Sequence, residues 1–249
     1  MNIKALLQEI DALKRAYEAA PKIDGALAAK RLEQFMIENT YNSNAIEGNS
    51  LTLRETATIL LEGATIAQKP VKDHLEAIGH RDAFDYIVDI AKNQIPLTQR
   101  VIRDIHALVL MNDAKNRGSY RSYPVEILGA EYVPPPPEQV PILMAELLER
   151  YEVSTRHPIE KIADFHIKFE RIHPFIDGNG RSGRLILNLE LMRVGYAPVD
   201  IKFTDRDAYY TCFDDYEIAG NSNKFIMLIA QYQLTEMRKL AHLASYAKE

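Results

Sequence analysis

The most informative part of the chain is a run of twelve residues, His173-Pro174-Phe175-Ile176-Asp177-Gly178-Asn179-Gly180-Arg181-Ser182-Gly183-Arg184. Residues 159–171 before it and 185–194 after it carry apolar side chains at helical spacing. The run is therefore predicted to be a loop that opens a helix. Gly178 and Gly180 allow backbone conformations that other residues avoid, and they let the backbone approach a ligand closely. Free amides at the positive end of the following helix would form an anion site.

Four side chains in this run suit chemistry on a polyphosphate. His173 is a candidate base and Asp177 a candidate metal ligand. Arg181 and Arg184, three residues apart, share one face of the predicted helix. With the amides they would supply a base, a metal ligand, an anion cradle and a charge clamp. A glycine-rich turn with nearby arginines is also a common structural feature, so the spacing alone leaves both interpretations open.

The run also matches a known motif at every fixed position. It resembles the Fic family signature, His-Pro-Phe-x-Asp/Glu-Gly-Asn-Gly-Arg-x-x-Arg. Kinase-like Doc proteins usually have a lysine where Gly180 stands, so this chain is more similar to the nucleotide-transferring branch. The resemblance covers about residues 98–230. It implies an all-α fold, a Fic-type helical bundle with one short β-hairpin called the flap.

The resemblance further implies a reaction. AMP would move from ATP to a Ser, Thr or Tyr hydroxyl of a protein, and pyrophosphate would leave, as in a nucleotidyltransferase. His173 would be the general base, because its ordinary pKa lies near working pH. Asp177 would hold Mg²⁺, which prefers oxygen ligands and phosphates. The phosphates would be bound by Gly178, Asn179, Gly180 and Arg184, with Arg181 supporting the loop.

The adenine contacts follow the family pattern less closely. Tyr210 resembles the family's aromatic residue near adenine. Its usual asparagine partner is replaced at the expected spacing by Glu217, and the nearest asparagine is Asn221 in a predicted turn. We therefore predict Tyr210 and Asn221 as the adenine contacts.

A second motif lies near the N-terminus. A predicted helix over about residues 27–46 is followed by Gly48, a natural C-terminal stop, and Glu47 then lies at the negative end of that helix. A solvated acid in a frayed last turn is one interpretation. However, Ser-x-x-x-Glu-Gly resembles the inhibitory motif of Fic proteins with an N-terminal inhibitory helix. This resemblance predicts an inhibitory set of Ser43, Glu47, Gly48 and Asn49, with Glu47 paired to Arg184.

The segment over residues 116–137 breaks helical periodicity. Val125 and Ile127 alternate with Glu126, and glycine follows, which predicts a short hairpin. A decorative loop is an equal alternative from the pattern alone. The resemblance implies a flap that holds a target segment by strand addition, formed by Val125, Glu126, Ile127, Leu128 and Gly129.

The other segments are predicted to be helical. Residues 1–97 would form an N-terminal region that contains the inhibitory helix ending near residue 49, and residues 98–249 the Fic core with the C-terminal helix. Thr52 with Glu55 forms a predicted capping box, and Thr98 is a predicted helix cap. His74 and His80 are predicted at the surface, and the histidines without motif positions are predicted to be structural: His106, His157, His166 and His242.

Composition limits the function classes. The chain has 249 residues and a net charge of −5, with 47% hydrophobic and 26% charged residues, as in an ordinary globular protein. Nucleic acid is not an expected partner, since no basic stripe is present, and no apolar run approaches membrane-spanning length. The N-terminal residues do not resemble a signal peptide, and the single Cys212 fits a reducing compartment. The predicted location is therefore the cytoplasm.

Several functions stay open from the sequence. The first is transfer of AMP from ATP to a protein target, possibly the chain itself, in a monomer or a homo-oligomer. The enzyme could instead transfer another phosphate-containing group, such as UMP or phosphocholine, or remove AMP with a water oriented by Glu47. A non-catalytic module that binds peptides along the hairpin edge is a fourth possibility, which the intact His173, Asp177 and Arg184 disfavour.

Overall fold

The structure is a computed structural model that describes residues 2–127 and 132–246. Within these ranges the chain forms ten α-helices and two short 3-10 helices, and no β-strand. Their bounds are α1 (Ile3–Ala19), α2 (Gly25–Ile46), α3 (Leu53–Glu62), α4 (Val71–Lys92), α5 (Gln99–Val109), η1 (Pro137–Gln139), α6 (Val140–Val153), α7 (Pro158–Ile172), α8 (Asn179–Arg193), η2 (Phe203–Asp205), α9 (Arg206–Ala219) and α10 (Asn223–Tyr246). The predicted all-α class is confirmed.

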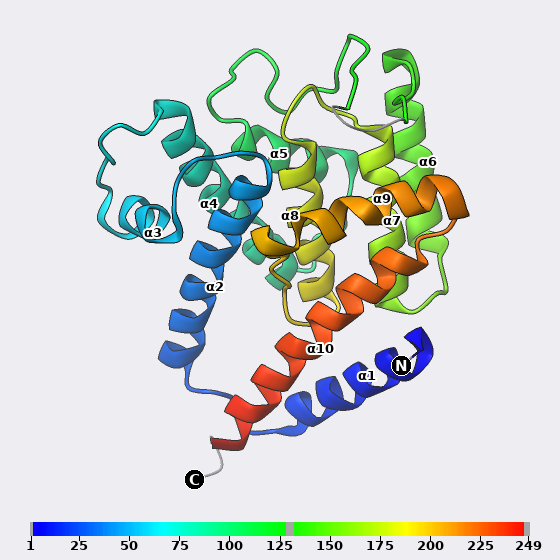
Figure 1. The fold of residues 1–249 in the computed structure, drawn as a ribbon. Coiled ribbons are helices and arrows are strands. Elements are labelled where there is room, and N and C mark those ends of the chain that lie inside the picture. Colours follow the sequence, from blue (N-terminus) through cyan, green and yellow to red (C-terminus); the bar gives the residue numbers. More distant parts are fainter. Residues whose placement is uncertain (1, 128–131, 247–249) are drawn as a thin grey trace.

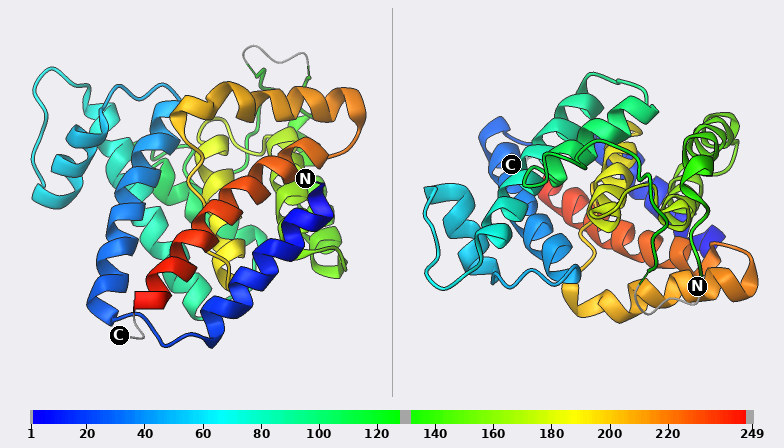
Figure 2. Two further views of the ribbon diagram at one scale, coloured as in Figure 1. Left: turned by 60° about the horizontal axis from the view of Figure 1, so that its bottom comes forward. Right: turned by 90° about the horizontal axis from the view of Figure 1, so that it is seen from above.

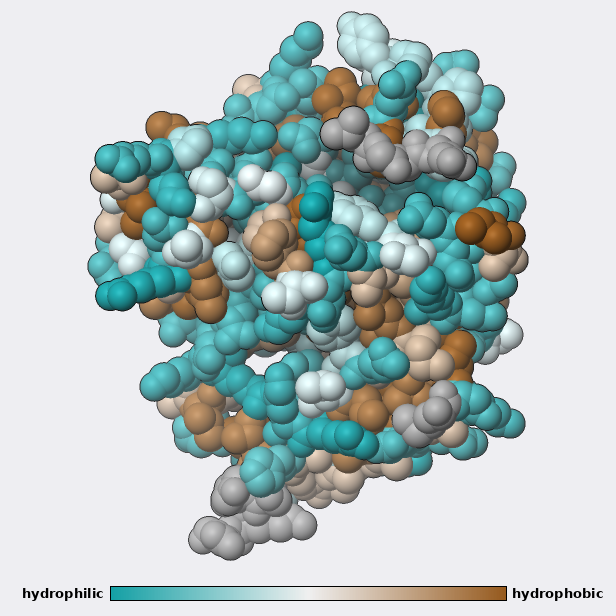
Figure 3. All heavy atoms as spheres, viewed as in Figure 1, coloured by the Kyte–Doolittle hydropathy of each residue, from teal (hydrophilic) through white to brown (hydrophobic). Residues whose placement is uncertain are grey.

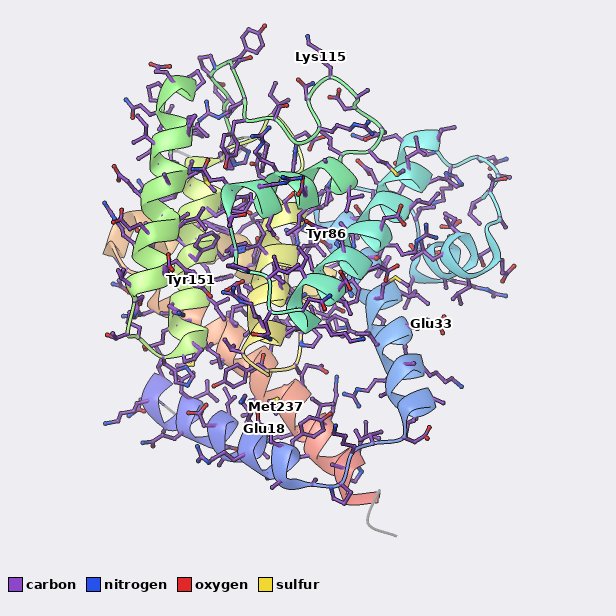
Figure 4. The ribbon with its side chains drawn as sticks, turned by 180° about the vertical axis from the view of Figure 1, so that it is seen from behind. Glu18, Glu33, Tyr86, Lys115, Tyr151 and Met237 are labelled. Carbon is purple, nitrogen blue, oxygen red and sulfur yellow. The ribbon has the colours of Figure 1, made fainter. Side chains whose placement is uncertain are left out.

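Helix α8 is the centre of the fold, and α4, α5 and α7 pack around it (Figure 1). Its apolar residues except the partly buried Met192, and most of its polar residues, are buried, as expected for a helix covered on nearly all sides. Buried polar groups on such a helix need partners. For example, Tyr151 of α6, labelled in Figure 4, donates a 2.6 Å hydrogen bond to Glu190 Oε2 of α8.

The remaining helices surround this centre. Helix α1 lies alongside α10, at the end of the molecule that carries the C-terminal part of α10 (Figures 1 and 2). The C-terminal end of α2 and the N-terminal end of α9 lie next to each other in both figures. Residues from both of these ends lie near the first turns of α8, as the contacts below show.

Local sequence signals explain several helix ends. The predicted capping box is present: Thr52 Oγ1 accepts from the amide of Glu55, and Glu55 Oε2 accepts from the amide of Thr52. Thr98 caps α5 through the amide of Val101, also as predicted. Each such cap satisfies backbone donors that the helix itself leaves free.

The described residues of the predicted hairpin form no strand. Residues Val125 to Ile127 have irregular backbone, and Leu128 and Gly129 lie outside the described residues. The described ends of the segment are held by side-chain bonds instead of a strand ladder. Arg121 is buried and donates to the carbonyl of Tyr123 through Nη1 and to that of Pro135 through Nη2.

The surface prediction for His74 and His80 is wrong. His80 is 0% exposed and its Nδ1 lies 3.0 Å from Thr40 Oγ1 of α2. His74 is 9% exposed, and its Nε2 accepts from the amide of Ile66. Helix α4 is covered by both α2 and α8, so it has more than one buried face.

No helix in residues 2–127 and 132–246 is long and apolar enough to cross a membrane. On the face shown in Figure 3, hydrophilic side chains predominate and apolar ones occur in small scattered groups.

Candidate active site

As predicted, the signature run is a loop that opens a helix: residues 173–178 connect α7 to α8, and residues 179–184 form the first turns of α8. His173 ends α7 in the left-handed region, with φ of 48°, and Gly178 precedes α8 with φ of 76°. The side chain of Asn179 closes the loop by two 2.9 Å hydrogen bonds, accepting from the Phe175 amide and donating to the Phe175 carbonyl. The side-chain amide of Asn179 is therefore occupied within the loop. Its backbone N–H lies in the first turn of α8, where helical amides have no partner within the helix, and can bind a ligand.

The imidazole of His173 is set up as a base. Its Nδ1 lies 3.3 Å from the Glu170 carbonyl. A carbonyl can only accept, so Nδ1 carries the proton and Nε2 keeps its lone pair. Burial lowers the pKa of His173 below its ordinary value, more than the Glu170 carbonyl raises it. The ring is therefore neutral at working pH.

A second histidine fixes the loop from behind. The Gly118 amide donates to His106 Nδ1 at 2.9 Å, so Nε2 carries the proton and donates to the Asp177 carbonyl, also at 2.9 Å. The His106 ring stacks on Phe175 with ring centres 3.6 Å apart. Burial lowers the pKa of His106 to about 4. His106 was predicted to be structural, and no motif in the sequence marks its contact with the site.

The carboxylate of Asp177 is half exposed at the mouth of the loop, with 52% of its side chain accessible. Its Oδ1 accepts from the Gly178 amide at 2.6 Å and from Arg181 Nη2 at 3.2 Å. Within the described residues no three His, Cys, Asp or Glu side chains form a metal-binding group. Asp177 is thus a single carboxylate beside the first amides of α8.

Arg181 lies beneath this loop and is only 2% exposed. Its Nη1 lies 3.0 Å from Glu76 Oε1 on α4, and its Nη2 reaches Asp177. Glu76 was not among the predicted site residues. A lone glutamate in a helix has no sequence signal for such a contact, because its partner lies far along the chain.

Arg184 makes the ion pair that the inhibitory motif predicts. Its Nη2 lies 2.8 Å from Glu47 Oε1, and 2.8 Å from the Ser43 carbonyl. Its Nε donates to Ser43 Oγ at 3.0 Å. The Arg184 side chain is 4% exposed. Burial opposes its charge, but Glu47 and other nearby groups outweigh burial and raise the pKa of Arg184.

Gly180 leaves space for this arrangement, and Gly48 provides the turn that follows Glu47. A Cβ at Gly180 would overlap Glu47 Oε1, so the carboxylate reaches the α8 N-terminus only because residue 180 is glycine. Gly48 has φ of 90°, a conformation that favours glycine. Asn49 then donates to Glu76 Oε2 at 2.9 Å and to the Asp73 carbonyl at 3.1 Å. The predicted inhibitory set is therefore brought together with Arg184 and α4.

A buried polar group lies on the other side of Arg184. His166 Nε2 lies 2.8 Å from the Tyr209 hydroxyl, and Arg184 Nη1 lies 3.5 Å from the same oxygen. Glu170 Oε1 is buried without a hydrogen-bond partner among the described residues, and a Cβ at Gly183 would overlap it. Burial raises the pKa of Glu170 to about 8. None of these side chains carried a sequence signal for the site.

The two predicted adenine contacts do not lie together. Tyr210 is in the first turns of α9, with the Arg206 guanidinium 5.0 Å from its ring centre, and is 36% exposed. Asn221 follows the C-terminal end of α9, roughly 15 Å further along the helix axis. Its side chain donates to the Ala219 carbonyl and accepts from the Asn223 amide, which organises the turn before α10. Both residues stay predictions as adenine contacts, and Tyr210 is the one that lies close enough to Glu47 and Arg184 to interact with their charges.

Comparison with known proteins matches this site to a family. Residues 96–191 match the model of the Fic/DOC family. A Drosophila yakuba protein adenylyltransferase Fic is 36% identical over 228 residues, which cover 90% of this chain and 45% of that protein. The chain spans about half the length of the curated relatives that it matches.

Solved structures give the same assignment. A Fic-domain signaling protein from Bacteroides thetaiotaomicron is 28% identical with a TM-score of 0.84, over 98% of this chain and 97% of that one. Fic-1 from C. elegans, residues 134–508, is also 28% identical, with a TM-score of 0.85 over 96% of this chain and 71% of that one. The matched residues include the whole loop between α7 and α8, and the chain belongs to the Fic/DOC family.

Proposed function

We propose that this chain is a protein adenylyltransferase that moves AMP from ATP to a hydroxyl group of a protein. The observation that carries the proposal is that His173, whose Nε2 has no hydrogen bond among the described residues, lies on the loop before α8, the helix that carries Arg184. Relatives at 34–36% identity bear the name protein adenylyltransferase Fic, which supports the same activity. Because the chain spans only part of those relatives, the activity is a proposal for this chain.

Each residue of the site has a separate role in the proposed reaction. His173 Nε2 takes the proton from the target hydroxyl as its oxygen attacks the α-phosphorus of ATP, and the bond to pyrophosphate breaks. The free amides at the start of α8 hold phosphate oxygens. Arg184 binds the terminal phosphate, because its planar guanidinium is always charged and suits phosphate. The ring of Tyr210 lies exposed near Glu47 and is our candidate contact for the base.

Asp177 fits a magnesium site. Mg²⁺ in nucleotide sites is commonly held by one or two carboxylates together with substrate phosphates and water. Asp177 is one exposed carboxylate beside the proposed phosphate cradle, and its Oδ1 is held by Gly178 and Arg181 while Oδ2 has no hydrogen bond among the described residues. Bound there, Mg²⁺ would stabilise the charge on the leaving pyrophosphate.

Autoinhibition by Glu47 follows from the same geometry. The carboxylate of Glu47 occupies Arg184 and lies against Gly180, where the phosphates of ATP are expected. ATP bound beside Glu47 would lack the contact with Arg184, and its α-phosphorus would not be aligned with the attacking hydroxyl. Small misplacements of this kind lower the rate by large factors. The proposed resting state is therefore weakly active.

The test is transfer from α-labelled ATP to proteins of a cell lysate, followed by mass spectrometry. We expect weak labelling by the wild type, strong labelling by Glu47→Gly and none by His173→Ala. ATP, UTP and CDP-choline compared as ligands identify the transferred group. If the folded Glu47→Gly variant transfers no label to any protein from ATP, from UTP or from CDP-choline, the transferase proposal is refuted.

Removal of AMP is a second candidate, because the Glu47 carboxylate lies at the site and is one-third exposed. In that role it would orient a water molecule toward the phosphorus. Incubation of the labelled targets with wild type and Glu47→Gly separates the two: loss of label that needs Glu47 supports removal. The cytoplasmic location and a homo-oligomeric state stay predictions.

A further inference from the structure

We propose that Glu76 is a positioning residue for Asp177, acting through Arg181. This inference rests on the proposed function, because it takes Asp177 to be the magnesium carboxylate. Glu76 belongs to α4, which lies outside the signature and carries no motif. Its side chain is 8% exposed, so it is a buried acid placed under the loop.

The relay has three members. Glu76 Oε1 lies 3.0 Å from Arg181 Nη1, and Arg181 Nη2 lies 3.2 Å from Asp177 Oδ1. Arg181 is 2% exposed, so its charge needs buried anions, and removing one partner of a buried pair leaves the other uncompensated. Glu76 is the buried partner, whereas Asp177 is 52% exposed and available to a ligand.

The effect on Asp177 follows from this sharing. With Glu76 present, the guanidinium charge is shared between two carboxylates, and the guanidinium contacts Asp177 through Oδ1 alone. Without Glu76, Asp177 becomes the main anion for a buried arginine and is drawn into that ion pair. The arginine then competes with Mg²⁺ for the carboxylate. Outer-shell partners of this kind commonly change metal affinity or activity by about 10- to 100-fold.

Glu76 is also tied to the inhibitory segment. Its second oxygen, Oε2, accepts from Asn49 Nδ2 at 2.9 Å. Thus one carboxylate is shared between the loop after α2 and the arginine behind Asp177. The position of the Asp177 carboxylate and the position of the segment after α2 therefore both depend on Glu76.

The experiment uses the Glu47→Gly chain as parent, so that inhibition does not obscure the result. The affinity for ATP is measured by calorimetry with Mg²⁺ and with the metal chelated, and the ratio of the two reports metal binding without any transfer. The metal concentration for half-maximal transfer is measured in parallel. Glu76→Gln should lower the affinity ratio, and raise the metal requirement, by about tenfold or more.

Asp73→Asn is the matched control. Asp73 lies one turn earlier on α4, is equally buried, and holds the same loop through the amide and hydroxyl of Ser50, but no hydrogen bond or ion pair joins it to Arg181 among the described residues. It should leave the affinity ratio unchanged. A general loosening of α4 would affect both variants alike, and that result overturns the relay.

Arg181→Lys supplies a second variant if Glu76→Gln does not fold. A single ammonium group cannot span both carboxylates as the guanidinium does. Arg181→Lys should lower the affinity ratio as Glu76→Gln does. The double variant Glu76→Gln with Arg181→Lys should lower the ratio no further than either single variant. An unchanged ratio in folded Glu76→Gln or Arg181→Lys overturns the relay while the proposed function stands. A parent that binds ATP without any metal dependence removes the magnesium role of Asp177, and the relay with it.

Discussion

Replacing Glu47 with glycine should convert a weakly active protein into a strongly active one. The carboxylate accepts a 2.8 Å hydrogen bond from Arg184 Nη2. A hydrogen bond to a charged group contributes about 1.5–3 kcal/mol. Since one-third of the Glu47 side chain is exposed, solvent screening favours the lower end of that range. About 1.5 kcal/mol corresponds to roughly tenfold in an equilibrium.

The structure also indicates that the clamp survives this change. Arg184 keeps two bonds to Ser43, from Nε to the hydroxyl and from Nη2 to the carbonyl. Glu47 has ordinary backbone angles, φ of −89° and ψ of 7°, so glycine there needs no rearrangement. The rate of AMP transfer should therefore rise by at least about tenfold, and realignment of ATP adds to this gain.

The assay is the initial rate of labelling with α-labelled ATP, on targets and on the protein itself. Glu62→Gly is the matched control, because Glu62 also ends a helix before a glycine and makes no ion pair among the described residues. Its rate should equal that of the wild type. Glu47→Gly with Arg184→Ala should be inactive again. If Glu47→Gly transfers AMP no faster than wild type and the Glu62→Gly control, the inhibitory reasoning is wrong.

Three further changes test the site and its supports. His173→Ala should lower transfer by about 10²- to 10⁴-fold without unfolding the protein. Because burial lowers the pKa of His173, the transfer rate of the wild type should fall on acidification with a midpoint below the ordinary histidine pKa of 6.5. A midpoint above 6.5 would contradict the role of neutral His173 as the base. Arg121→Lys should lose hydrogen bonds to the carbonyls of Tyr123 and His173 and lower stability by about 1–3 kcal/mol, measured by urea unfolding; an unchanged midpoint contradicts it. The folded state keeps the Glu170 proton up to about pH 8 while the unfolded state loses it above 4.5, so wild-type stability should fall across that window. Glu170→Gln should remove this fall in stability, which is at most about 5 kcal/mol. If the unfolding midpoints of wild type and Glu170→Gln change with pH in parallel, Glu170 is not the cause.

Several features could be read from the sequence because their causes are local. The loop between α7 and α8 follows from glycines between two amphipathic segments, and the caps at Thr52 and Thr98 depend on residues three positions away. The pair between Glu47 and Arg184 spans 137 positions. It could still be predicted, because an acid at a helix C-terminus needs a cation, and the family resemblance indicated which one.

Other features required the packed helices. Glu76 and Arg181 lie on different helices, and nothing local to either residue selects the other. His80 was placed at the surface because the periodicity of α4 does not reveal that α2 and α8 cover it from two sides. Asn221 is near Tyr210 along the chain, but Tyr210 lies in the first turns of α9 and Asn221 lies beyond its C-terminal end. Sequence periodicity reports which residues avoid water, but the partner of each buried charge is set by how the helices cross, and that is a property of the tertiary structure.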